Sequence, residues 1–216
     1  MAPRKIALLT DSCADLSPRL AEENHIHVVP LHIRCADGEY RDGVDIHPAD
    51  IYARLRSGEL PKTSLPAGED ITGAFDRIAA EGYDGVIAVM LSSGLSGTYH
   101  SACLAAEELA EKYPERTVRV IDTLQASMGE GLAVYYAATL KNEGKSLAEV
   151  ADWFEANKMR VCAWFTVDDL MFLKRGGRLG GGAAVMGTLL GIKPVLHVDD
   201  DGHLIAMEKG RGRRAS

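Results

Sequence analysis

The sequence predicts an α/β fold, with an N-terminal Rossmann-like domain built on a parallel β-sheet and a second α/β domain after it. Short apolar runs alternate with amphipathic stretches through residues 1–157. The run over residues 85–91 is apolar at nearly every position, as in a parallel strand that helices cover on both faces. Near Lys158 this alternation gives way to glycine-rich and hairpin-like segments, which marks the start of the second domain.

The same patterns locate the elements of the first domain in chain order. Strands are expected over residues 5–10, 27–33, 85–91 and 117–121. Helices are expected over residues 17–23 and 50–57, from about residue 69, and over residues 98–112, 127–142 and 146–157. The helix from residue 69 has the clearest pattern, because apolar residues recur on one of its faces: Ile71, Ala74, Phe75, Ile78 and Ala79. The helix over 146–157 begins with a capping box formed by Ser146 and Glu149.

The second domain is expected to occupy residues 158–216. Its predicted elements are a strand over 161–167, a short helix over 168–174, and a β-hairpin made of residues 192–198 and 203–208. The segment DDDG between the two hairpin runs is a turn signal. The sequence stops at KGRGRRAS without a matching structural element, so this domain is predicted to be incomplete, that is, truncated.

Composition disfavours several classes of protein. The chain has 216 residues, 46% of them hydrophobic, which is enough to form a packed core. A net charge of −7 disfavours binding to nucleic acid, and contact with a membrane surface is not predicted. The sequence has neither the pattern of a signal peptide nor that of a membrane span, so a cytoplasmic protein is expected. Neither a disulfide nor a metal site is expected, because the cysteines are scattered: Cys13, Cys35, Cys103 and Cys162.

The loop SSGLSGT, residues 92–98, lies where the apolar strand over 85–91 gives way to a helix. Open parallel sheets bind their ligands beyond the carboxyl ends of the strands. Glycines let the backbone approach a ligand, hydroxyls donate hydrogen bonds, and the free N–H groups of the next helix favour an anion. The loop has no Lys or Arg, so a single carboxylate fits it better than a triphosphate. The alternative is that its serines only cap the helix.

Other polar segments have simpler interpretations. Thr63, in KTSLPAGED, is expected in a second polar loop at the same edge of the sheet, or merely at a helix entry. The acidic residues Asp11, Asp15, Asp42 and Asp45 fit no calcium or zinc pattern, so they are expected in solvated turns.

A serine-dependent hydrolase or transferase that acts on a small anionic substrate is the enzymatic alternative. Its nucleophile would be Ser96, and His100 on the following helix would be the base. The pattern G-x-S-x-G of a nucleophile elbow is incomplete, because Thr98 stands where the last glycine belongs. The sequence also lacks a P-loop and a dinucleotide-binding fingerprint.

Six segments in order resemble the DegV family of fatty-acid-binding proteins: KIALLTDSCADL, KTSLPAGE, LSSGLSGTYHSA, VIDTLQASMGEG, TVDDLMFLKRGGRLGG and GTLLGIKPVL. The resemblance implies two α/β domains that bury one long-chain fatty acid between them, such as palmitate, stearate or oleate, and no further cofactor. The hydroxyls of Thr63 and Ser96 would hold its carboxylate. Ser93 and the backbone N–H groups of Gly94 and Gly97 would assist them.

The resemblance also implies a protein partner. Bacterial relatives present the fatty acid to an ATP-dependent fatty-acid kinase, which makes acyl phosphate for phospholipid synthesis, and the carrier performs no catalysis itself. Two basic segments, KRGGRLGGG and KGRGRR, are either solvated loops or a docking patch for an acidic or phosphorylated partner. By the resemblance, Arg178 and Arg211 would lie on the surface that docks the kinase. A fatty-acid-sensing regulatory protein on the same fold is the remaining alternative.

The acyl chain should dominate the affinity for such a ligand. Burying a chain of about 16 carbons contributes on the order of 10 kcal/mol, at ~0.8 kcal/mol per methylene and before the costs of binding. A hydroxyl adds roughly 1.5–3 kcal/mol to a charged partner, so the hydroxyls should mainly orient the ligand. Apolar residues of the second domain are the candidate tunnel walls: Phe165, Leu170, Phe172, Leu173, Met186, Leu189, Leu190 and Ile192.

Overall fold

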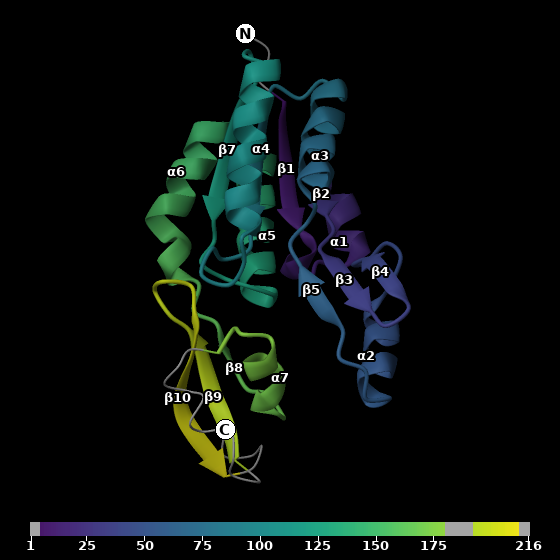
Figure 1. The fold of residues 1–216 in the computed structure, drawn as a ribbon. Coiled ribbons are helices and arrows are strands. Elements are labelled where there is room, and N and C mark those ends of the chain that lie inside the picture. The colour runs from purple at the N-terminus through teal and green to yellow at the C-terminus, as the bar shows by residue number, and fades with distance from the viewer. Residues whose placement is uncertain (1–4, 180–191, 212–216) are drawn as a thin grey trace.

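A four-stranded parallel sheet between two pairs of helices forms the larger part of the molecule (Figure 1). The computed structural model describes residues 5–179 and 192–211. The strands of the sheet, in spatial order, are β2 (Ile26–Val29), β1 (Ile6–Asp11), β6 (Gly85–Met90) and β7 (Thr117–Asp122). On one face lie α3 (Gly68–Ala80) and α4 (Thr98–Lys112), and on the other α5 (Met128–Asn142) and α6 (Leu147–Asn157).

The alternation of side chains along β1 explains this three-layer arrangement. Ile6 and Leu8 pack into the apolar core shared with α5 and α6, whereas Ala7 and Leu9 pack into the core shared with α3 and α4. Every residue of β1 and of β6 is buried, as expected for strands covered on both faces. The predicted strand over 85–91, the helix from residue 69 and the capping box of Ser146 and Glu149 are all confirmed.

The strand order contains a topological switch point between β1 and β6. After β1 the chain moves outward to β2, and it then returns to the other side of β1 to form β6. Connections therefore leave the carboxyl ends of β1 and β6 in opposite directions, which opens a crevice for ligands there. The 3-10 helix η1 (Ser12–Ala14) and α1 (Pro18–Glu23) follow β1 at this edge.

A small antiparallel sheet corrects the predicted strand over residues 27–33. The chain leaves the main sheet after β2, at Pro30, and continues as β3 (His32–Cys35) in a separate sheet of order β4-β3-β5. The partners of β3 are β4 (Gly38–Arg41) and β5 (Lys62–Ser64), and α2 (Pro48–Arg56) lies between them in the chain. The backbone N–H of Leu31 donates to Ser12 Oγ at 3.1 Å, so this sheet is attached beside the end of β1.

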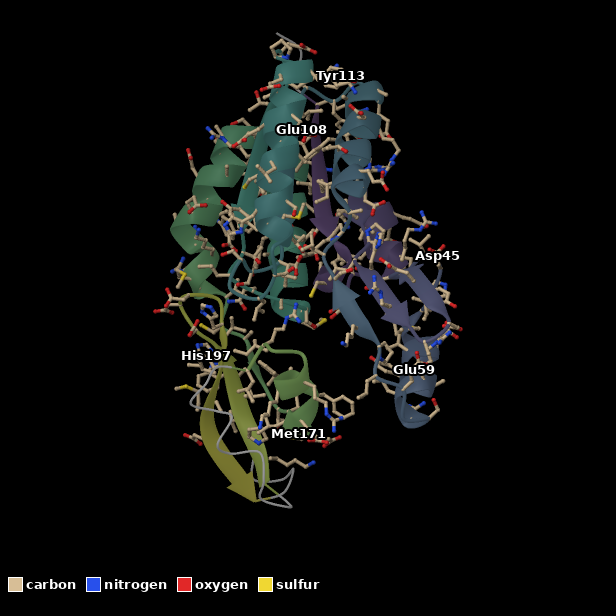
Figure 2. All side chains as sticks on the ribbon, in the orientation of Figure 1. Asp45, Glu59, Glu108, Tyr113, Met171 and His197 are labelled. Carbon is tan, nitrogen blue, oxygen red and sulfur yellow. The ribbon has the colours of Figure 1, made fainter. Side chains whose placement is uncertain are left out.

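The C-terminal segment forms a third sheet below the carboxyl edge of the main one (Figure 1). Its antiparallel order is β10-β9-β8, with β8 (Trp164–Phe165), β9 (Ile192–Val198) and β10 (Leu204–Arg211). The predicted hairpin is confirmed, but the expected strand over 161–167 is reduced to β8, after the 3-10 helix η2 (Lys158–Arg160). Helix α7 (Leu170–Arg175) follows β8, and Figure 2 shows Met171 of α7 and His197 of β9 in this part of the molecule.

Membrane-spanning elements are not found in the described ranges 5–179 and 192–211, where no helix combines the necessary length and apolar character. The division into domains at residues 1–157 and 158–216 stays a prediction.

Candidate functional site

The loop after β6 is fixed by hydrogen bonds to the end of β7. The backbone N–H of Ser93 donates to Asp122 Oδ1 at 3.1 Å, and the N–H of Ser92 donates to the Gln125 carbonyl at 2.9 Å. Ser92 is fully buried, and Ser93 and Gly94 are half-buried. The predicted anion-binding loop SSGLSGT, residues 92–98 (the anion loop), therefore has a defined conformation at the carboxyl edge of the sheet.

Ser96 lies at the N-terminus of α4. Its Oγ is 2.9 Å from Thr98 Oγ1 and accepts a hydrogen bond from the Thr98 N–H at 3.3 Å. The side chain is half-buried, and Gly97 is the cap residue of the helix. A hydroxyl here can donate to a carboxylate while the positive end of the helix dipole stabilises the negative charge.

The turn of the β9–β10 hairpin packs directly on this loop. Ser92 Oγ donates to the Gly202 carbonyl at 2.8 Å, and a Cβ on Gly94 would lie only 2.7 Å from the Asp201 carbonyl oxygen. Gly202 has φ +76°, and a Cβ there would overlap Ser92 Oγ. Glycine at both positions thus permits a backbone-to-backbone contact between the two predicted domains.

Thr63 lies in β5 of the small sheet, and not in a loop at the carboxyl edge of the main sheet as expected. Its side chain is exposed, and β5 pairs with β3 so that Thr63 is opposite Ile33. The segment that follows nevertheless reaches the anion loop, because a Cβ on Gly97 would lie 3.4 Å from Leu65 Cδ2. The fold therefore brings the Thr63 segment alongside the Ser96 loop.

Arg178, from the basic segment KRGGRLGGG, lies beside the SSGLSGT loop, which has no Lys or Arg of its own. Arg178 Nε donates to the Leu95 carbonyl at 3.2 Å, although the residue as a whole is exposed. The guanidinium thus lies against the same loop as Ser96. The backbone of Arg211 pairs with Ile192 at the far end of the hairpin, and its side chain lies outside the described part of the chain.

A cavity of about 840 Å³ lies between α5, α6 and the third sheet. Most of its lining is apolar or aromatic, including Tyr136, Trp153, Trp164, Val198 and Leu204. Val198 and Leu204 flank the hairpin turn that packs on Ser92, so the cavity and the anion loop lie on either side of one turn. Its volume is in the range of pockets that hold small molecules.

The predicted tunnel walls agree with this cavity only in part. Phe165 lines it, whereas Leu170, Phe172 and Leu173 do not. Met186, Leu189 and Leu190 lie outside the described residues, as does the side chain of Ile192. Residues of α5 and α6, including Leu132, Tyr136 and Trp153, line the cavity without having been predicted.

The geometry gives no support to Ser96 as an activated nucleophile. Its Oγ pairs with the Thr98 hydroxyl, and the exposed His100 packs its ring edge-on against Tyr99, with ring centroids 5.3 Å apart. A general base must lie within hydrogen-bond reach of the proton it takes.

Asp15 and Asp45 are exposed, as expected for solvated turns, and Asp42 is half-buried, whereas Asp11 contradicts that expectation. Asp11 is fully buried at the end of β1, where its carboxylate accepts the N–H groups of Cys13 at 2.9 Å and of Leu91 at 3.0 Å. Beside it lies Glu130 of α5, also fully buried, which the sequence analysis missed. Burial, and then the nearby Asp11 carboxylate, raise the pKa of Glu130 well above its usual range. Burial likewise raises the pKa of Asp11.

Comparison with known proteins places this architecture in a family. A family model described as "Uncharacterised protein, DegV family" matches residues 5–216. A DegV domain-containing protein of Clostridium perfringens is 41% identical over 215 residues, which cover 99% of this chain and 74% of that protein. The chain belongs to the DegV family.

Two solved structures of DegV proteins have the same fold. A DegV family protein from Thermus thermophilus, described for its fatty acid binding, is 40% identical with a TM-score of 0.84, over 97% of this chain and 73% of that one. A stearic-acid-binding protein from Eubacterium ventriosum is 30% identical with a TM-score of 0.87, over 97% of this chain and 72% of that one. The predicted DegV membership and α/β fold are confirmed, and the choice of carboxylate-binding residues stays a prediction.

Proposed function

We propose that this protein is a carrier that binds one long-chain fatty acid and presents its carboxylate to an ATP-dependent fatty-acid kinase, for acyl phosphate formation and phospholipid synthesis. Palmitate, stearate or oleate would be the ligand. The observation that carries this proposal is the hairpin turn of β9 and β10. It packs on the Ser92–Gly94 backbone on one side and borders a large apolar cavity on the other. The relatives described as fatty-acid-binding proteins support the same ligand class.

The carboxylate would lie at the N-terminus of α4. Ser96 and Thr63 would donate their hydroxyl hydrogens to it, with Ser93 and the N–H groups of Gly94 and Gly97 beside them. Half-burial of Ser96 favours a charge-assisted hydrogen bond, since little water competes there. Arg178 is exposed and donates to the Leu95 carbonyl beside this loop, where it would contact a kinase docked over the carboxylate.

The acyl chain would pass the hairpin turn and enter the cavity between α5, α6 and the third sheet. Aromatic rings and aliphatic side chains line this space, so each buried methylene contributes about 0.8 kcal/mol. The ligand would therefore lie between residues 1–157 and residues 158–216, which is the proposed domain boundary.

Mass spectrometry of an organic extract from the purified protein tests the ligand. We expect a single long-chain acid in the extract of the wild-type chain. Ala163→Phe would fill the cavity that Ala163 lines, and this variant should lose long acids while it still binds octanoate. Ala80→Phe, at an exposed residue near the end of α3, is the matched control and should keep the wild-type ligand. An empty wild-type protein that also fails to bind added palmitate would overturn the proposal.

The partner is tested separately with the loaded protein, ATP and a fatty-acid kinase from a bacterium that encodes a DegV protein. Formation of acyl phosphate supports the carrier function, and Arg178→Glu should reduce it by weakening docking while fatty acid stays bound. Fatty acid binding without acyl phosphate formation would favour the sensor alternative. Ester hydrolysis that is lost in Ser96→Ala would favour the enzymatic one.

A further inference from the structure

Two carboxyl groups and one thiol lie close together at the carboxyl end of β1. Asp11 ends β1, Cys13 lies in η1, and Glu130 lies in the first turn of α5. One carboxylate oxygen from each acid and the Cys13 Sγ all lie within 4.8 Å of one another. Gly131 makes this approach of α5 possible, because any Cβ there would overlap the Ala14 carbonyl oxygen.

One atom of this cluster lacks a partner. Both oxygens of Asp11 accept backbone N–H groups, and Glu130 Oε1 accepts the Thr10 hydroxyl at 3.3 Å. Glu130 Oε2 is buried without any hydrogen bond from the described residues, although the side chain is 0% exposed. A buried carboxylate oxygen without a partner is costly, so a proton or a cation should occupy the space in front of it.

The charges around the cluster favour a cation. Two further carboxylates act on the cluster: Asp42 on Asp11, and Asp15 on Glu130. Asp15 accepts a hydrogen bond from Ser127 Oγ at 2.5 Å, and Asp42 accepts one from Ser12 Oγ at 2.7 Å, which keeps both carboxylates near η1 and the start of α5. A positive ion would therefore neutralise several buried or half-buried negative groups at once.

We propose that Asp11, Cys13 and Glu130 bind a divalent cation of the zinc class. One thiolate and two carboxylates are ligands that Zn²⁺ accepts, whereas Mg²⁺ and Ca²⁺ prefer oxygen ligands alone. The three protein ligands leave a fourth position for water, and half-buried Cys13 provides the route of entry. Binding releases to solvent the protons that the thiol and the carboxyl pair hold. The site shares no residue with the proposed fatty acid site, so either proposal can fail alone.

Titration of the chelator-treated, full-length chain with Co²⁺ tests this site. We expect one equivalent to bind with a thiolate-to-cobalt charge-transfer band, and Zn²⁺ to displace it. Cys13→Ser should abolish the band and weaken Zn²⁺ binding by about 100-fold or more, which exceeds the usual effect of residues around the ligands. Cys103→Ser is the matched control, because Cys103 is also half-buried, and it should keep the band.

Two results would overturn the proposal. The first is a folded wild-type chain that binds no Co²⁺, since the cluster would then be a carboxyl pair that shares a proton. The second is Zn²⁺ affinity that does not change in Cys13→Ser, because the metal would then bind elsewhere. Glu130→Gln provides an independent check, with the same expected loss of affinity, and Cys13→Ser decides alone if that variant does not fold.

Discussion

The two hydroxyls proposed to hold the carboxylate come from regions of very different construction. Ser96 lies on a half-buried loop whose backbone is tied to β7 and whose helix packs on the main core. Thr63 lies on a three-residue strand with every residue exposed. The small sheet that contains it has a core of only three buried residues among those described: Ile33, Cys35 and Ile46.

The small sheet is instead held in place largely by polar and ionic contacts. His32 bridges Glu39 at 2.9 Å and Asp70 at 2.7 Å, which connects β3 both to β4 and to the start of α3. Arg54 pairs with Asp37 at 2.8 Å. Exposed ion pairs are weak and are screened by salt. One half of the proposed site is therefore fixed by apolar packing, and the other half should respond to pH and salt.

Disrupting the contact between the hairpin turn and the Ser96 loop should give the largest loss of fatty acid affinity. Gly202→Ala places a Cβ on Ser92 Oγ and forces a left-handed conformation on a non-glycine residue, at a combined cost of roughly 3 kcal/mol. We expect fatty acid affinity to fall by about 100-fold in a titration with a fluorescent fatty acid. Circular dichroism should still show a cooperative thermal transition of the main sheet.

Gly144→Ala is the matched control for this change. Gly144 also has a positive φ, +83°, but a Cβ there would meet nothing within 4 Å. It should cost only the backbone strain of about 1–2 kcal/mol and leave fatty acid binding unchanged. Equal loss of affinity in both variants would mean that the contact with Ser92 has no role in the site.

Removing the hydroxyls of Ser96 and Thr63 one at a time compares the contributions of the loop and of the small sheet to palmitate affinity. Ser96→Ala should weaken palmitate binding by roughly 10- to 100-fold, the range for a hydrogen bond to a charged group. Thr63→Val should weaken it by about 10-fold or less, because water competes at an exposed residue. Calorimetric titration of both variants and of the double variant gives their coupling.

Ser101→Ala, within α4, is the control and should bind palmitate as the wild type does. If the two hydroxyls share one carboxylate, the losses in the double variant should not be additive. Unchanged affinity in the double variant would refute the assignment of this loop and strand to the carboxylate.

Sequence patterns predicted the fixed region much better than the small sheet. Continuous apolar character identifies β6, and helical periodicity identifies α3, because both elements are formed by burial in one large core. By contrast β4 and β5 are short and mostly exposed, so their sequences have no alternation to detect. Pro30 was a signal that β2 ends early, since proline has no backbone N–H with which to continue the hydrogen-bonded ladder to β1.

The same difference applies to the candidate site. The glycines and hydroxyls of the anion loop are local in sequence and could be recognised there. The contacts of Ser92 with Gly202 and of Leu95 with Arg178 join distant segments, and only the fold brings them together. Glu130 gave no signal, because a single acidic residue in a helix is ordinarily exposed.

A change of pH should weaken only the small sheet that contains Thr63. Hydrogen bonds to Glu39, and then to Asp70, raise the pKa of His32 above its ordinary value near 6.5, while Arg34 and Arg41 lie close to the same acids. The imidazolium therefore stabilises the small sheet fully below about pH 6.5, and this contribution is lost as the pH rises through the raised pKa. We expect faster amide exchange in β3 and β5 above that value, and palmitate affinity lower by a few-fold.

His32→Gln should remove most of this pH dependence, whereas His100→Gln, at an exposed residue of α4, should keep it. Exchange in β6 should not follow the same titration, because its strand is buried on both faces. A pH dependence that is the same in His32→Gln as in the wild type would show that another group controls the small sheet.

The smallest effect on binding is expected from weakening the fixed region far from the loop. Ser146 caps α6, where its Oγ accepts the Glu149 N–H at 3.3 Å and its own N–H donates to Glu149 Oε2 at 2.8 Å. Ser146→Ala should lower the free energy of unfolding by about 1 kcal/mol in urea titrations. Palmitate affinity should stay within error of the wild type, because the cap makes no contact with the loop and the remaining folded population is still large. A loss of affinity in this variant would mean that a change in α6 alters the Ser96 loop at a distance. The loop and the small sheet with Thr63 would then not respond independently.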